Sequence, residues 1–210
     1  MAFNFVIFDI DGTIMDTRSQ YIASLKKTLE NYHDRKFSQE ELRPFYGKPG
    51  LPTLKCLGVA ECDVEKVHKF LFSHYISACG TAKPFEGIAD LLGELKVKRR
   101  CLAIATSRLG FEIIEDEALK PIVEYFDVVV CSEKGIPPKP HPAILQKTLM
   151  KLDATPEQAV YIGDTDYDYM AAKNAGISFI GAGWGLEETE LGNKEWETIC
   201  KKPFDVLALV

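Results

Sequence analysis

"FDIDGTIMDT" (residues 8–17) places two carboxylates, Asp9 and Asp11, at the end of an apolar run that begins at Phe5. Such a run is typical of a buried strand, and residues two apart on a strand point the same way. Burial of a charge is costly unless the charge is paired, bound to a metal or used in chemistry. Gly12 follows and allows a sharp turn or a close approach to a ligand. The stretch therefore predicts a strand that ends in an acidic site, with an ordinary Asp-Gly turn as the alternative.

The composition limits the class of protein. The chain has 210 residues, of which 46% are hydrophobic and 27% charged, as expected for a water-soluble globular protein with one large domain or a core and a smaller inserted domain. No apolar stretch reaches the length of a membrane span, and no signal peptide is expected. The net charge of −6 argues against nucleic-acid binding. Cysteines without CxxC spacing indicate reduced thiols and a cytoplasmic protein. They are Cys56, Cys62, Cys79, Cys101, Cys131 and Cys200.

Apolar runs alternate with helical patterns along most of the chain. This alternation predicts an α/β fold, in which a doubly wound, mainly parallel sheet forms a Rossmann-like core with helices on both faces. Such sheets bind ligands at the carboxyl ends of their strands, which is where Asp9, Thr106 and Asp164 are expected. The expected strands are 5–8, 101–105, 128–131, 160–162 and 177–180, and the expected core helices are 88–97, 111–125, 142–152 and 167–174.

The interval from about residue 15 to residue 83 contains helical patterns and no convincing strand. It is too long for an ordinary connection between two elements. We therefore predict an inserted all-α cap domain at 15–83, and a catalytic core formed by 1–14 and 84–210. The helices expected in the cap are 21–32, 39–45 and 64–77.

Two further loops carry groups that suit a phosphate. "AIATSR" (103–108) runs from a strand into Thr106 and Ser107, whose hydroxyls and neighbouring backbone N–H groups could bind a phosphate oxygen. A simple helix cap is the alternative. "PPKPHP" (137–142) surrounds Lys139 with prolines, and a rigidly held lysine supplies positive charge to a nucleophile and a phosphate. A solvated loop lysine is the alternative there.

"YIGDTDYD" (161–168) places Asp164 after an apolar run and Asp168 one helical turn later. Mg2+ prefers oxygen ligands and usually takes one or two carboxylates beside waters and phosphate. A calcium-binding EF-hand loop is the rival interpretation. It fails because Tyr169 stands where that loop needs glycine, and Ala175 where it needs glutamate.

Taken together, the four stretches resemble the motifs of the haloacid dehalogenase-like hydrolases, over residues 5 to about 185. The matching residues are "DIDGT", Thr106, Lys139 in "KPHP", and "GDTDYD". The position of the helical insert resembles the phosphoglycolate phosphatase-like branch. The resemblance implies a Mg2+-dependent phosphatase that hydrolyses a small phosphorylated metabolite through an aspartyl-phosphate intermediate. No nucleic-acid or membrane partner is expected, and the protein is expected to be a monomer or a homodimer.

The resemblance also implies a role for each motif residue. Asp9 is expected to be the nucleophile and Asp11 the general acid and base. Mg2+ would be held by Asp9, the Asp11 backbone carbonyl and Asp164, with Asp168 supporting the metal site. The residues expected to bind phosphate or substrate are Thr106, Lys139, Thr13, Ser107, Arg108, Lys48 and Arg18.

Lys48, in the turn "YGKPG" (46–50), and Arg18 are the two cap residues expected to meet the leaving group. Within the same superfamily, a hydrolase of inorganic pyrophosphate and a phosphosugar mutase or phosphatase stay open as alternatives. The β-phosphoglucomutases carry a histidine where this chain has Tyr21, which disfavours a mutase. An inactive metal- or phosphate-binding regulatory protein is the alternative from a different class, and the intact acids argue against it.

Overall fold

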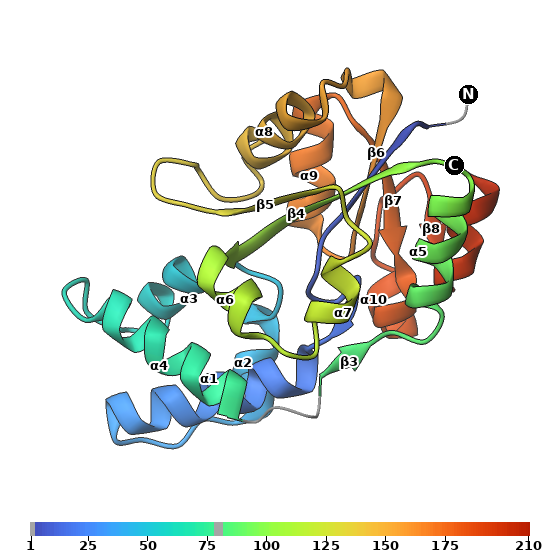
Figure 1. The fold of residues 1–210 in the computed structure, drawn as a ribbon. Coiled ribbons are helices and arrows are strands. Elements are labelled where there is room, and N and C mark those ends of the chain that lie inside the picture. The colour runs from blue at the N-terminus through green and yellow to red at the C-terminus, as the bar shows by residue number, and fades with distance from the viewer. Residues whose placement is uncertain (1–2, 78–81) are drawn as a thin grey trace. The chain divides into compact units, whose positions relative to one another are not determined.

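The computed structural model describes residues 3–77 and 82–210. It contains two compact units, one formed by Met1–Asp16 with Pro84–Val210 and the other by Thr17–Lys83. Their elements can be followed in Figure 1. Cys79 lies outside the described residues, and the other five cysteines are free thiols.

The larger unit is built on a six-stranded sheet with the order β5-β4-β1-β6-β7-β8. Every neighbouring pair of these strands is parallel. β1 therefore lies in the middle of the sheet, between β4 and β6, and the chain continues outward on both sides of it. The predicted α/β fold with a parallel sheet is confirmed. The strands are β1 (Phe5–Phe8), β4 (Cys101–Leu109), β5 (Val128–Ser132), β6 (Ala159–Gly163), β7 (Ser178–Ala182) and β8 (Ile199–Cys200).

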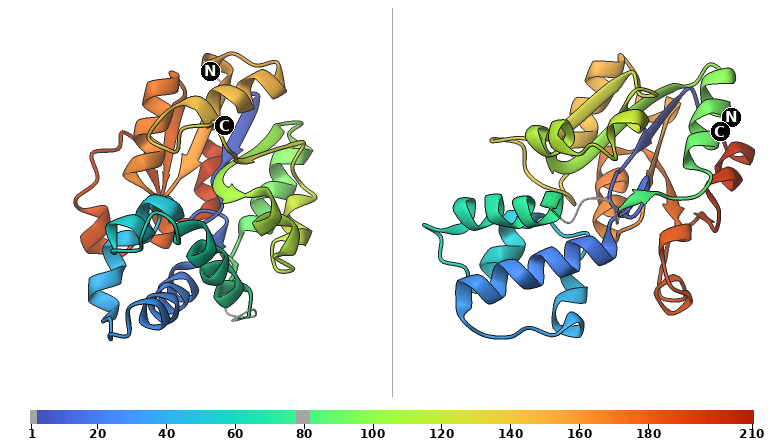
Figure 2. Two further views of the ribbon diagram at one scale, coloured as in Figure 1. Left: turned by 90° about the vertical axis from the view of Figure 1, so that its left-hand side faces the viewer. Right: turned by 60° about the horizontal axis from the view of Figure 1, so that its bottom comes forward.

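Helices cover both faces of the sheet, as Figures 1 and 2 show. Side chains of β1 alternate between the two faces, so Val6 and Phe8 pack in one apolar cluster and Ile7 in the other. All three are fully buried, which explains why β1 reads as a continuous apolar run. The first cluster is covered by α5 (Ile88–Val97), α6 (Gly110–Glu115), α7 (Lys120–Val123) and η4 (Pro203–Ala208), and the second by α8 (Ala143–Leu152) and α9 (Asp166–Ala175).

The structure corrects the single helix predicted over 111–125. Two short helices, α6 and α7, stand there instead. The break falls at Asp116, whose backbone leaves the helical region (φ −83°, ψ 93°) and whose carboxylate accepts a hydrogen bond from Ala118 N at 3.2 Å. Pro121 then lies in the first turn of α7, where its missing N–H costs nothing.

Strand limits also differ from the prediction. β4 runs on to Leu109 rather than ending at Ala105, and its register against β5 shifts between these residues. β2 (Met15–Asp16) and β3 (Lys83–Pro84) form a separate two-stranded sheet at the two ends of the interval that was expected to lack strands. Together with β8, these two-residue strands are too short to show a periodic pattern in the sequence.

Between Thr17 and Ser77, the regular elements of the smaller unit are all helices. α1 (Arg18–His33) packs against α2 (Gln39–Leu42) and α4 (Val64–Ser77), and α3 (Gly50–Cys56), which the sequence pattern does not predict, packs against α4. The short η1 (Arg43–Phe45) follows α2. The role of this unit as a cap stays a prediction. Its core includes the fully buried Leu25, Leu29, Leu42 and Leu54.

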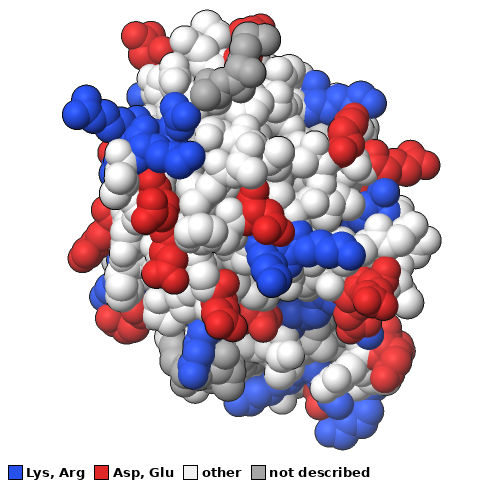
Figure 3. Space-filling model, turned by 90° about the vertical axis from the view of Figure 1, so that its right-hand side faces the viewer, with Lys and Arg blue, Asp and Glu red and all other residues white. Residues whose placement is uncertain are grey.

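No helix in the described part of the chain is both long and apolar enough to cross a membrane. On the face drawn in Figure 3, Lys and Arg side chains are interspersed with Asp and Glu, and neither sign forms a continuous patch. That face therefore lacks the basic stripe typical of nucleic-acid binding.

Candidate active site

The parallel sheet brings three buried aspartates together at the carboxyl ends of β1 and β6. Asp9 follows β1, Asp164 follows β6, and Asp168 lies in the first turn of α9. One carboxylate oxygen of each lies within 4.8 Å of the others. The three residues are 6%, 2% and 1% exposed, respectively. So many buried acids in one place require positive charge nearby.

Lys139, in the loop before α8, supplies one such charge. Its Nζ lies 2.9 Å from Asp9 Oδ1, 2.6 Å from Asp168 Oδ1 and 2.9 Å from the hydroxyl of Tyr161. Burial disfavours the ammonium, but the carboxylates of Asp168 and Asp9 outweigh that effect and raise the pKa of Lys139. Lys139 is therefore a fixed cation between two of the three acids.

One lysine cation does not neutralise three buried carboxylates. The pKa values of Asp9 and Asp164 are raised as a result. Burial raises the pKa of Asp9 to about 7, against the opposing effect of Lys139. Burial, followed by the charges of Asp168 and Asp9, raises the pKa of Asp164 well above its usual value. A divalent cation at this position would reverse both shifts.

A carboxylate oxygen that is free to bind a cation belongs to Asp164 rather than to Asp168. Asp168 Oδ1 accepts from Lys139 and lies 2.8 Å from the hydroxyl of Tyr161, and its Oδ2 accepts from Thr165 N at 3.1 Å. By contrast, Asp164 Oδ1 is buried and has no hydrogen-bond partner among the described residues. An orphaned carboxylate oxygen beside a second buried acid fits Mg2+, which prefers oxygen ligands.

The turn after β1 is fixed by backbone hydrogen bonds and by a tryptophan. Ile10 O accepts from Ile14 N at 2.9 Å, and Trp184 in η3 (Gly183–Gly185) donates from Nε1 to Thr13 O at 2.9 Å. Thr13 Oγ1 is buried and has no partner within the described residues. Thr13, a predicted substrate ligand, therefore lies in the turn that carries Asp11 and has an unused hydroxyl.

The predicted phosphate loop lies where β4 departs from its regular register. Thr106 is 1% exposed, and its Oγ1 accepts from Arg108 N at 3.2 Å. Ser107 is half-buried. β4 neighbours β1 in the sheet, with Ile104 opposite Phe8, so Thr106 follows on the same edge as Asp9.

Arg108, expected as a substrate ligand, donates hydrogen bonds to two carboxylates. Its Nε and Nη2 lie 2.9 and 2.7 Å from the two oxygens of Asp11, and its Nη1 lies 2.8 Å from Asp116 Oδ2. Asp11 is thus tied to the predicted phosphate loop at the end of β4 as well as to the turn after β1.

The two expected cap residues belong to the helical unit. The guanidinium of Arg18 lies 5.1 Å from the ring centre of Tyr46, and Lys48 Nζ lies 5.0 Å from the ring centre of Phe45. Both cations therefore lie beside one short loop of that unit. Their contact with a substrate stays a prediction.

Residues 6–182 match the family described as haloacid dehalogenase-like hydrolase. The chain belongs to this family. It is 30% identical to the pyrophosphatase PpaX of Bacillus velezensis over 203 residues, which cover 96% of this chain and 94% of that protein. The predicted family and the predicted enzyme class, a hydrolase of the phosphatase type, are confirmed.

Solved structures of this hydrolase family share the same fold. A candidate phosphoglycolate phosphatase from Lactobacillus plantarum is 24% identical and aligns with a TM-score of 0.90 over the whole of both chains. A haloacid dehalogenase-like hydrolase from Streptococcus pneumoniae is 27% identical, with a TM-score of 0.81 over 99% of this chain and 98% of that chain.

Two residues of the candidate site were not identified from the sequence. Tyr161 stands in an apolar run, yet its hydroxyl is buried and accepts a hydrogen bond from Lys139. The signal was a polar-tipped residue inside a strand next to the acidic loop. Asp116, the second partner of Arg108, lies within the predicted helix 111–125. Nothing in the sequence around it indicates a role in the site.

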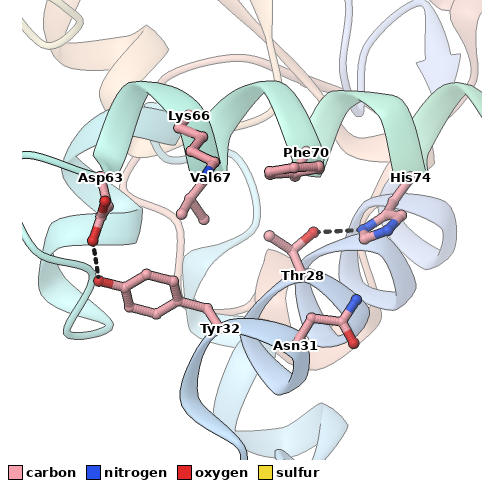
Figure 4. A pocket seen from close by; sticks show the side chains of 8 residues that line it. All are labelled: Thr28, Asn31, Tyr32, Asp63, Lys66, Val67, Phe70 and His74. Carbon is pink, nitrogen blue, oxygen red and sulfur yellow. Dashed lines mark hydrogen bonds between the residues drawn. The ribbon is translucent and has the colours of Figure 1, made fainter.

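A cavity of about 500 Å3 lies within the helical unit of the hydrolase, between α1 and α4 (Figure 4). Hydrogen bonds of 2.9 Å, from Tyr32 to Asp63 and between Thr28 and His74, cross it. None of the predicted site residues lines it. The lining residues are Thr28, Asn31, Tyr32, Asp63, Lys66, Val67, Phe70 and His74.

Proposed function

We propose that this hydrolase is a Mg2+-dependent phosphatase that hydrolyses a small phosphate monoester, such as phosphoglycolate, through an aspartyl-phosphate intermediate. The observation that carries the proposal is the position of Asp9. Its carboxylate ends the central strand of the sheet, lies 2.9 Å from Lys139 Nζ and shares a buried cluster with Asp164 and Asp168. A carboxylate so placed can act as a nucleophile toward phosphorus.

The metal would be held by Asp9, Asp164 and the backbone carbonyl of Asp11. The orphaned Asp164 Oδ1 supports this assignment. Bound there, Mg2+ would neutralise the acids and withdraw charge from the phosphate oxygens. Asp168 supports the site indirectly, because its oxygens hold Lys139 and the first turn of α9.

The chain's own residues account for both half-reactions. Asp9 attacks phosphorus while the bond to the leaving oxygen breaks, and Asp11 gives that oxygen a proton, so an alcohol departs. Water then attacks the aspartyl phosphate, Asp11 takes its proton, and inorganic phosphate leaves with Asp9 restored. Lys139, Thr106 and the hydroxyl of Thr13 stabilise the phosphoryl oxygens.

A second candidate substrate is inorganic pyrophosphate, in which phosphate takes the place of the alcohol as leaving group. The 30% identity to a protein named pyrophosphatase favours it. A mutase is disfavoured by Tyr21, which lies in α1. An inactive regulatory protein would be expected to lack acid–base residues, whereas Asp9 and Asp11 are both present.

The test is a screen of phosphorylated metabolites and pyrophosphate with Mg2+ and with EDTA. Wild-type protein should hydrolyse at least one ester in Mg2+ and none in EDTA. Asp9→Asn should abolish turnover, because an amide does not form the acyl phosphate, whereas Asp90→Asn, at an exposed position of α5, should not. Full activity in EDTA, or a largely active Asp9→Asn variant, would contradict the proposal.

A further inference from the structure

Arg108 holds Asp11 in a two-pronged hydrogen bond. Nε lies 2.9 Å from Oδ2 and Nη2 lies 2.7 Å from Oδ1, so the planar guanidinium and the carboxylate meet edge to edge. This geometry fixes the plane of the carboxylate as well as its position. A lysine would fix only a distance.

Arg108 is itself anchored from behind. Its Nη1 donates to Asp116 Oδ2 at 2.8 Å, and Asp116 Oδ1 accepts from Ala118 N at 3.2 Å, at the break between α6 and α7. The kink that separates these two helices therefore supplies the anchor. The direction of the guanidinium is set by the fold rather than by Asp11 alone.

The three hydrogen-bonded side chains, Asp116, Arg108 and Asp11, differ in their exposure to solvent. The side chains of Asp116 and Arg108 are 4% and 8% exposed, but that of Asp11 is 30% exposed. The two buried groups thus form a support beneath a carboxylate that a substrate can reach. All three guanidinium nitrogens already donate to carboxylates. A cation that binds a substrate phosphate directly would instead be expected to have donors available for it.

We propose that Arg108 is a positioning residue, which orients the carboxyl group of Asp11 toward the leaving oxygen. Asp116 holds Arg108 for this task. The inference rests on the proposed phosphatase function and replaces the expected role of Arg108 as a direct substrate ligand.

Two esters that differ in their need for a proton test the inference. 4-Nitrophenyl phosphate releases a stable phenolate without protonation, whereas 4-nitrobenzyl phosphate, longer by one methylene, releases an alcohol and needs the proton. The value of kcat/KM reports the steps up to cleavage of this bond. Arg108→Lys should therefore lower kcat/KM for the benzyl ester by about 10- to 100-fold, and for the phenyl ester by only a few-fold.

Asp116→Asn provides a second variant, which keeps Arg108 and loosens its anchor, and it should shift the ratio of the two kcat/KM values in the same direction. Lys96→Met, which breaks an exposed ion pair with Asp127 elsewhere in the same unit, should leave the ratio unchanged. Thermal unfolding shows whether each variant is folded. If either Arg108→Lys or Asp116→Asn does not fold, the inference is tested with the variant that does.

Parallel losses on both esters in the folded variants would overturn the inference. A direct contact between Arg108 and the phosphoryl group, which the esters share, gives that pattern through a raised KM, and so does general damage to the site. If wild-type protein in Mg2+ cleaves neither of these esters nor any other phosphate compound, the proposed function fails instead. The two failures are therefore distinguishable.

Discussion

Gly12 and Asp164 approach so closely that a Cβ on Gly12 would overlap the Asp164 carboxylate. Gly12 also has φ +77°, in the left-handed region that side chains disfavour. The turn after β1 and the loop after β6 therefore pack closely against each other, which is possible because Gly12 has no side chain. Sequence alone indicated a glycine that permits a turn; the structure shows that the same glycine leaves room for a proposed metal ligand.

Gly12→Ala should abolish most activity and weaken Mg2+ binding, because the new methyl group displaces Asp164. Turnover and Mg2+ titration calorimetry measure the two effects. Gly87→Ala is the matched control: Gly87 has φ +84°, but a Cβ there would meet nothing within 4 Å. It should lose about 1–2 kcal/mol of stability from backbone strain and keep its activity. Equal activity losses in the two variants would show that strain, rather than the contact with Asp164, is responsible.

Positions at strand ends could be predicted because they follow from local patterns. The apolar run over Phe5–Phe8 sets β1, the next apolar runs set its parallel neighbours, and a parallel sheet places Asp9 and Asp164 at one edge. The Arg108–Asp116 pair could not be predicted, because it depends on where a helical pattern breaks. The role of Tyr161 could not be predicted for a related reason. The sequence of an apolar strand does not show whether the hydroxyl of a tyrosine within it forms hydrogen bonds in the site.

Mg2+ binding should depend on pH. A carboxylate must lose its proton to bind a metal, and the pKa of metal-free Asp9 is raised to about 7. Below that pH Asp9 is mostly protonated, and the pKa of Asp164 is raised as well. Mg2+ affinity should therefore fall as pH decreases from 8 to 6, by up to about tenfold per pH unit for each proton released. Calorimetry in two buffers of different ionisation enthalpy measures both affinity and proton release. Affinity that is constant across this range would contradict the prediction, and Asp164→Asn should bind little Mg2+ at any pH.

Glu112 offers a pH effect on stability away from the acid cluster. Burial raises the pKa of Glu112 to about 7, although the N–H of Leu109, at 2.7 Å, and the charge of Arg108 oppose this. The native state then binds the proton more tightly than the unfolded chain does. The contribution is complete below the ordinary pKa of 4.5 and is lost as pH rises toward 7.

Glu112→Gln, which keeps the shape of the neutral acid, should flatten this dependence. In EDTA, the free energy of unfolding of wild-type protein should fall by up to about 3 kcal/mol more than that of the variant between pH 4.5 and 8. Urea denaturation across this range measures it, with Glu94→Gln, an exposed acid of α5, as control. Parallel curves for wild-type protein and Glu112→Gln would show that folding does not raise the pKa of Glu112.

The last prediction concerns Lys48, in the loop between η1 and α3 of the helical unit. Gly47 before it has φ +74°, Pro49 after it restricts the backbone, and Lys48 N donates to Phe45 O at 3.3 Å. The lysine is thus presented on a defined turn rather than on a flexible loop. A lysine cation binds negatively charged groups, such as a carboxylate or a second phosphate, and we predict that Lys48 meets an anionic leaving group.

Lys48→Ala should lower kcat/KM for an ester with an anionic leaving group by a loss of about 1–3 kcal/mol, typical of a charge-assisted contact. A small neutral aryl phosphate should be hydrolysed nearly as before, since it has no group for the lysine to meet. Lys69→Ala, at an exposed position of α4, removes the same charge from the same unit and should change neither rate. Equal losses of Lys48→Ala on both substrates would point to a disturbed helical unit, and no loss on either would make Lys48 an ordinary surface lysine.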